Sequence, residues 1–141
     1  MRSRSFRRED GAAAVEFALL TPLLFLILFG ILEFGIAFLH VQSIRSGVRE
    51  GGRNAAVGAP VNITRQKTVT ASSGSIPAGG EGDVSVSSSE GGRCTPNNIG
   101  SDVTVSYDTS NLPDGGIIIR LPLMPQMTLN PVLSATFRCE V

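Results

Sequence analysis

The feature that most constrains this chain is an apolar run near its N-terminus. Residues 17–32 contain no charged side chain, and residues 17–39 contain a single acid, Glu33. A helix needs about 20 predominantly apolar residues to cross the hydrocarbon core of a bilayer. The run therefore predicts a transmembrane helix at residues 12–39. The remainder of the 141-residue chain is long enough for one small domain.

An acidic residue, Glu16, directly precedes the uncharged run, and Gly11 lies five positions before it. Ionisable groups in a membrane span are costly and are usually functional. Cleavage between Gly11 and Ala12 would create an α-ammonium group one helical turn from the Glu16 carboxylate. The two charges can neutralise each other, which lowers the desolvation penalty of the new terminus. The spacing therefore predicts a peptidase cleavage site at Gly11 and Ala12.

Residues 1–11 form a basic leader that this cleavage would remove. Four arginines lie within it: Arg2, Arg4, Arg7 and Arg8. Positive residues beside a span favour the cytoplasmic side of the membrane. The leader therefore predicts a cytoplasmic N-terminus and an exported C-terminal part, although three arginines that follow the span weaken this bias.

The helix is predicted to continue beyond the membrane as an extension at residues 40–58. Apolar residues recur there at helical spacing, namely Val41, Ile44, Val48 and Ala55. Residues expected to fray and end the helix follow: Gly51, Gly52, Gly58 and Pro60. Three arginines at i+4 spacing, Arg45, Arg49 and Arg53, form a basic stripe that can face solvent, lipid headgroups or an acidic neighbouring subunit.

Residues 59–141 are predicted to form a small β-rich exported domain. Apolar and polar residues alternate at 102–107 and over nine residues at 133–141, a pattern typical of half-buried strands. Residues 116–121, GIIIRL, predict a third strand after a turn. Residues 71–93 are rich in Ser and Gly and indicate a loop that can hold a short strand at 83–88. The fold class is therefore α+β.

The chain has two cysteines, Cys94 and Cys139. Cys139 lies on the apolar side of the last predicted strand, so we expect it to face the core. An exported domain meets an oxidising compartment, where a disulfide is favoured over two free thiols. A Cys94–Cys139 bond would close a loop of 46 residues, which stabilises by about 4 kcal/mol in the chain-entropy model.

Few other residues suggest chemistry. The single histidine, His40, has no second histidine or nearby cysteine, which favours an interfacial anchor over a metal ligand. Glu33 lies 17 residues after Glu16, about 25 Å along a helix, near the outer boundary of the bilayer. The scattered acids of the β-rich region fall in or beside turns, where capping is expected. We therefore expect no enzyme, no metal and no cofactor, and the net charge of zero gives no sign of a nucleic-acid partner.

The N-terminal pattern resembles the type IV prepilin processing site: a basic leader, Gly11, four apolar residues, Glu16 and the aromatic Phe17. Over residues 7–58 the chain is similar to the TadE-like family, the pseudopilins or minor pilins of the tight-adherence pilus. The resemblance rests on four features: the VEFAL segment, the proline that follows it, an acid after Gly-Ile-Leu, and the segment GVREGGR at 47–53.

The resemblance implies cleavage by a prepilin peptidase after Gly11 and residence in a bacterial inner membrane. It also implies assembly with other pilins or pseudopilins on a pilus assembly platform. Glu16 and Phe17 would serve processing and assembly. Helix packing would use one apolar surface, together with Glu33: Leu20, Leu24, Ile27 and Ile31.

Two alternatives remain at the level of sequence. A conventionally secreted β-domain protein would be cut before Phe38, after the small residues of Gly35-Ile36-Ala37. The apolar run, however, exceeds the 7–15 residues of an ordinary signal peptide. A permanent single-pass anchor that presents an extracellular binding module would instead keep Met1. The mature N-terminus therefore distinguishes the three readings.

Overall fold

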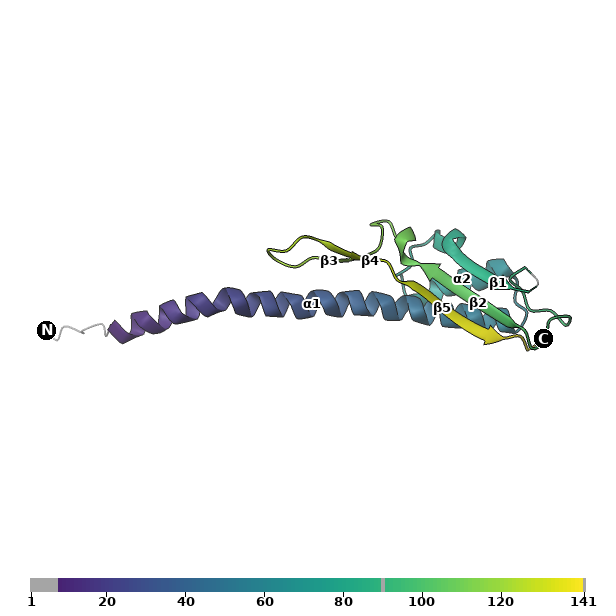
Figure 1. The fold of residues 1–141 in the computed structure, drawn as a ribbon, viewed down its shortest axis with the longest axis horizontal. Coiled ribbons are helices and arrows are strands. Elements are labelled where there is room, and N and C mark those ends of the chain that lie inside the picture. The colour runs from purple at the N-terminus through teal and green to yellow at the C-terminus, as the bar shows by residue number, and fades with distance from the viewer. Residues whose placement is uncertain (1–7, 90, 141) are drawn as a thin grey trace.

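A computed structural model describes residues 8–89 and 91–140, so most of the predicted leader lies outside the described residues (Figure 1). The chain begins with one continuous helix, α1, from Arg8–Ala56. Its 49 residues correspond to a length of about 73 Å. The first half projects away from the molecule, and the second half carries the remaining elements. The α+β layout, with a long apolar helix followed by a small antiparallel domain, is confirmed.

Helix α1 ends in a glycine-based cap and in a contact with the C-terminal segment. The N–H of Gly58, whose φ is 81°, donates to the carbonyl of Ala55 at 3.0 Å. A residue with positive φ just beyond the helix is the common way to satisfy its last carbonyls. The N–H of Glu140 donates to the carbonyl of Ala56, also at 3.0 Å. The helix therefore ends at Ala56, two residues before the expected end of the extension at residue 58.

Gly51 and Gly52, however, do not fray α1, and that expectation is wrong. Both lie inside the helix and are buried. A Cβ on Gly51 would overlap the side chain of Thr68, and a Cβ on Gly52 would lie 2.6 Å from the ring of Phe137. These glycines therefore permit close packing, which compensates for their low helix propensity.

A second helix, α2 (Val61–Ala71), packs against this part of α1. Its residues Thr64 and Thr68 are fully buried, and a Cβ on Gly47 of α1 would lie only 2.5 Å from the carbonyl oxygen of Thr68. Local sequence does not predict α2, because its β-branched residues have modest helix propensity and two of its three buried positions are polar. A short 3-10 turn, Gly80–Asp83, follows.

The main sheet is antiparallel and has the strand order β1-β2-β5. Its strands are β1 (Val84–Ser88), β2 (Asp102–Asp108) and β5 (Val132–Arg138). In the register of the sheet, Val105 lies opposite both Val86 and Ala135. The predicted strands at 83–88, 102–107 and 133–141 are thus confirmed, except that β5 ends at Arg138. A short 3-10 turn, Thr109–Asn111, follows β2.

The core lies between α1 and this sheet. Ile44 and Val48 of α1 pack in one cluster with Val103, Val105 and Tyr107 of β2, and these five side chains have exposures of 1% or less. The alternation predicted from sequence therefore separates buried from solvent-facing residues in β2, as expected for a sheet with one covered face.

The predicted strand at 116–121 forms a separate hairpin. Strand β3 (Ile117–Ile119) pairs with β4 (Met127–Leu129), with Ile117 opposite Leu129. Sequence patterning does not indicate β4, which is three residues long and has an exposed side chain at each position. The hairpin runs along α1 toward the N-terminus, beyond the end of the main sheet (Figure 1).

Candidate functional site

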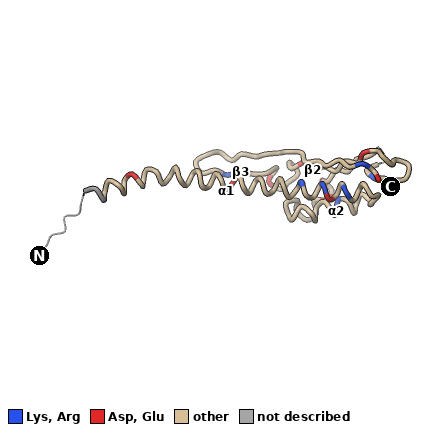
Figure 2. The backbone as a smooth tube through the Cα atoms, turned by 90° about the horizontal axis from the view of Figure 1, so that it is seen from below, with Lys and Arg blue, Asp and Glu red and all other residues tan. Residues whose placement is uncertain are grey.

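The projecting half of α1 exposes its apolar side chains. Of the predicted packing residues, Leu20 is 63% exposed and Ile31 is 66% exposed, and Leu24 and Ile27 are exposed as well. The helix meets the length and hydropathy expected of a membrane span. Figure 2 shows how sparse charge is along this half compared with the half beside the domain. Such a surface is stable only in lipid or against other apolar surfaces.

The candidate cleavage site lies near the beginning of α1. Gly11 and Ala12 are helical and exposed, and so are Glu16 and Phe17. A Cβ on Gly11 would meet nothing within 4 Å, so packing does not require this glycine. Glu16 follows Ala12 by four residues, which places the two on one helix face. The geometry fits the predicted pairing, and the roles of these residues stay predictions.

Helix α1 continues through Pro22, which lies inside it. Proline removes the N–H that would bond to the carbonyl four residues earlier. The neighbouring hydroxyl of Thr21 donates to the carbonyl of Phe17 at 2.7 Å. This bond satisfies a polar side chain within the helix, as required where no water is present.

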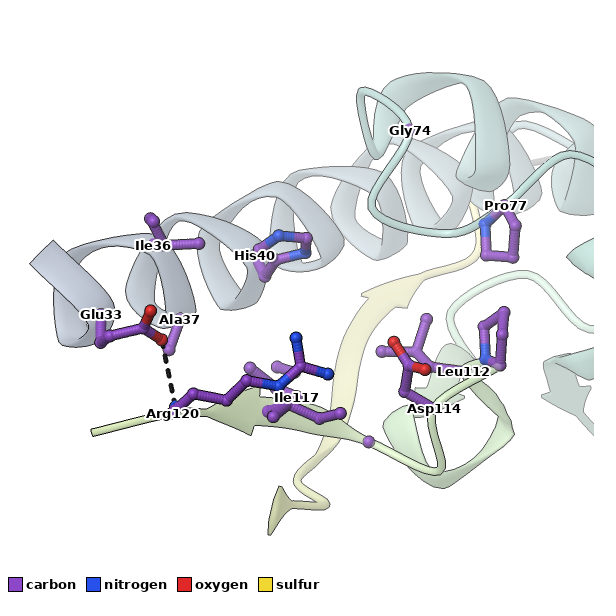
Figure 3. Close-up of a pocket in the computed structure, with 13 residues that line it drawn as sticks. Glu33, Ile36, Ala37, His40, Gly74, Pro77, Leu112, Asp114, Ile117 and Arg120 are labelled. Carbon is purple, nitrogen blue, oxygen red and sulfur yellow. Dashed lines mark hydrogen bonds between the residues drawn. The ribbon is translucent and has the colours of Figure 1, made fainter. Parts of the chain in front are cut away.

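Glu33 connects the helix to the hairpin. The backbone N–H of Arg120 donates to Glu33 Oε2 at 3.1 Å (Figure 3). Apolar contacts continue toward the domain, where Ala37 is buried with Ile117 and Ile119. One face of the predicted span near its outer end is therefore covered by protein. Sequence reasoning does not find this contact, because 87 positions separate Glu33 from Arg120.

A cavity of about 410 Å³ lies beside this junction. Glu33 and His40 of α1 line it on one side, and Asp114 and Arg120 line it on the other (Figure 3). Within the described part of the chain, no group of three or more His, Cys, Asp and Glu residues could hold a metal ion. His40 is exposed at this cavity, and its predicted anchoring role stays a prediction.

The basic stripe of Arg45, Arg49 and Arg53 is exposed along α1. The three arginines line a shallow depression together with Glu50 and Phe137. The stripe thus lies beside β5, on the part of α1 that carries the domain. The three surroundings expected for the stripe, namely solvent, lipid headgroups or an acidic subunit, stay predictions.

Cys94 and Cys139 form a disulfide, as the sequence predicts, with 5.4 Å between their Cα atoms. Both are buried, and Cys139 faces the core although it lies just beyond β5. The N–H of Cys139 also donates to the carbonyl of Ser101 at 2.7 Å. The disulfide therefore joins the loop before β2 to the segment that follows β5.

Two titratable groups of the domain have shifted pKa values. Burial raises the pKa of Tyr107, and the nearby carboxylates of Asp83 and Asp108 raise it further. Its buried hydroxyl has no hydrogen-bond partner among the described residues. The pKa of Asp108 is lowered because its carboxylate accepts the backbone N–H of Ser110 at 2.9 Å. Asp108 caps the turn after β2, which is a structural role.

Comparisons with known proteins bear on one part of the chain. No curated protein and no solved structure matches it. A family model does match, over residues 11–53. The matched segment begins at the candidate cleavage glycine and ends at the last arginine of the basic stripe, so it excludes the sheet and the hairpin. The family is described as TadE-like protein, so residues 11–53 of this chain are similar to that family.

Proposed function

We propose that this protein is a minor pilin, or pseudopilin, that a prepilin peptidase processes before it takes part in assembly of a tight-adherence pilus. The observation that carries the proposal is the TadE-like match at residues 11–53, which begins at Gly11. The projecting apolar helix that follows supports it.

Processing would prepare the helix to leave the membrane. Cleavage after Gly11 removes the basic leader and leaves an ammonium group on Ala12. The carboxylate of Glu16, one turn along the same face, neutralises that group within one chain or between neighbouring chains. Because a paired charge costs less to desolvate than a bare one, the processed helix can move from lipid into a stack of similar helices.

Assembly would then bury the surface that the single chain leaves exposed. On the projecting helix, exposed apolar side chains include Leu20, Leu24, Ile27 and Ile31. Packing against helices of other pilins would remove this apolar area from lipid or water. The partners are therefore other pilins or pseudopilins, the peptidase and the assembly platform.

The domain at the end of α1 favours a minor subunit. The principal pilin of such systems is little more than the helix, whereas this chain adds a disulfide-closed domain after it. We place the protein in the bacterial inner membrane, with a cytoplasmic N-terminus and the domain on the exported side, before it enters a pilus. Catalysis has no part in this role.

The test is mass spectrometry of the N-terminus in the native host, with and without the prepilin peptidase. We expect the mature chain to begin at Ala12 only when the peptidase is present. Gly11→Ala should reduce processing, and Glu16→Ala should leave cleavage intact but reduce incorporation into pili.

Gly35→Ala is the matched control, because a Cβ at Gly35, as at Gly11, meets nothing within 4 Å. A mature chain that begins at Met1 would instead indicate a permanent membrane anchor. One that begins at Phe38 would indicate ordinary secretion. Either result would refute the pilin assignment.

A further inference from the structure

The tip of the β3–β4 hairpin, residues 121–126, presents apolar side chains to its surroundings. Leu123 is 97% exposed and Met124 is 57% exposed, and Met127 at the start of β4 is exposed as well. Residues 121–137 contain no charge. Leu123 also has a φ of 66°, in the left-handed region that is strained for a non-glycine residue. A tip that holds a leucine outward with this strain is unusual for a surface in water.

The tip lies beside the predicted membrane span. Leu121 Cδ2 is 3.8 Å from the position of a Cβ on Gly30, and Gly30 belongs to the uncharged run at 17–32. Gly30 lies three residues before Glu33, about 4.5 Å closer to the N-terminus of the helix. The hairpin extends in that direction, toward the N-terminus of α1 (Figure 1). The exposed side chains of the tip are therefore level with residues that the span places in lipid.

The last charged residues before the apolar parts of the hairpin and of the helix lie at the same level along α1. Arg120 is the last charged residue before the tip, and its N–H bonds to Glu33, the only acid within residues 17–39. Beyond this pair, toward the N-terminus of α1, both segments are free of charge until Glu16. A shared polar boundary is what a membrane surface at this level would require.

The backbone of the tip suits the interface rather than the centre of a bilayer. Pro122 and Pro125 have no N–H to leave unsatisfied, and the N–H of Met124 donates to the carbonyl of Leu121 at 3.2 Å. A two-stranded hairpin still has open edges, which exclude it from the hydrocarbon core. These features fit a shallow position of about 5–10 Å at the boundary of headgroups and acyl chains.

We propose that residues 121–126 insert into the exported-side interface of the lipid bilayer, beside the helix of the same chain. This inference rests on the proposed membrane span of α1. The protein then contacts the membrane through both α1 and the hairpin tip. These two contacts fix the orientation of the domain relative to the membrane surface. Removal of the subunit into a pilus must withdraw the hairpin tip together with the helix.

The test uses tryptophan as a depth probe, because the chain contains none. Met124→Trp places the probe in the tip at an exposed position with ordinary backbone geometry. Phe25→Trp reports on the span. Ile99→Trp, at an exposed site in the loop next to Cys139, is the aqueous control. The full chain is reconstituted at a low protein-to-lipid ratio in vesicles of phosphatidylethanolamine and phosphatidylglycerol that contain brominated phosphatidylcholine.

We expect Trp emission from the Met124→Trp variant to fall by about half, with bromine near the headgroup end of the acyl chain the better quencher, as a depth of about 5–10 Å implies. Emission from the Ile99→Trp variant should stay unchanged. Quenching of the Phe25→Trp variant alone would overturn the hairpin proposal and leave the span intact. If the Phe25→Trp variant is not quenched either, the span itself is wrong and the hairpin proposal fails with it.

A second copy of the chain is the other conceivable cover for the tip. In that case emission from the Met124→Trp variant would shift to shorter wavelength as the protein-to-lipid ratio rises, without quenching by bromine. This result would also overturn insertion into lipid. Far-UV circular dichroism and retention of the Cys94–Cys139 bond establish that each variant is folded.

Discussion

The backbone N–H of Arg120 donates a hydrogen bond to the carboxylate of Glu33, 3.1 Å away and 87 positions earlier in the chain. This bond joins the hairpin to α1 at the end of the uncharged run. It gives Glu33 a specific function in the isolated subunit, in addition to its predicted place at the outer boundary of the bilayer.

Replacement of Glu33 should loosen the hairpin. Glu33→Ala removes the acceptor, and the loss should be about 1 kcal/mol, below the range for buried hydrogen bonds to charged groups because the site is partly exposed to solvent. The amide of Arg120 should then exchange its hydrogen roughly five times faster in hydrogen-exchange mass spectrometry. Glu33→Gln keeps a neutral acceptor and should have a smaller effect. Glu16→Ala is the control, and equal exchange in all variants would contradict the role of this bond.

Gly51 should not tolerate a side chain. The methyl group of Gly51→Ala would overlap Thr68, whose hydroxyl is held by the carbonyl of Thr64 at 2.9 Å. Overpacking of this kind costs about 1–3 kcal/mol, which exceeds the gain of about 1 kcal/mol in helix propensity. Thermal unfolding in detergent should therefore show a lower midpoint. Gly35→Ala, in open space on the same helix, should be neutral or stabilising, and a matching decrease there would contradict the packing argument.

Removal of the disulfide should destabilise the domain strongly. A Cys94→Ala, Cys139→Ala double variant frees a 46-residue loop in the unfolded chain, a loss of about 4 kcal/mol in the chain-entropy model. Denaturant unfolding of the oxidised protein and of the double variant measures the difference. Reduction of the native protein should lower its stability by a similar amount. Coincident unfolding curves would show that the bond does not constrain the unfolded state.

Tyr107 should make the domain sensitive to alkaline pH. Burial raises its pKa above the ordinary value of 10.0, so the folded state favours the neutral phenol. The contribution of this preference to the free energy of unfolding is fully present below pH 10 and is lost as the pH rises through the raised pKa. The chain has one tyrosine and no tryptophan, so tyrosinate absorbance reports this group alone.

Tyr107→Phe is the matched variant for this prediction. It should unfold less readily at alkaline pH than the native protein and should be as stable near neutral pH, because the buried hydroxyl has no partner among the described residues. A native phenol that titrates at its ordinary pKa would refute the prediction.

Local sequence was sufficient for the features that a short window of residues imposes. An uncharged run of this length at residues 17–32 can remain stable only as a span or a packed helix. The period-two alternation at 102–107 and 133–138 corresponds to the buried and exposed faces of β2 and β5. Two cysteines left one pairing to predict, and the structure contains it.

Long-range packing decided the rest. Helix α2 is stabilised by buried threonines that fit against Gly47 and Gly51, so Gly51, which was expected to fray α1, is a contact point instead. The hairpin lies along α1 because Ile117 and Ile119 bury against Ala37. No local pattern encodes these contacts, since each joins segments many residues apart. Their stability comes from apolar area that is removed from solvent only when the chain is folded.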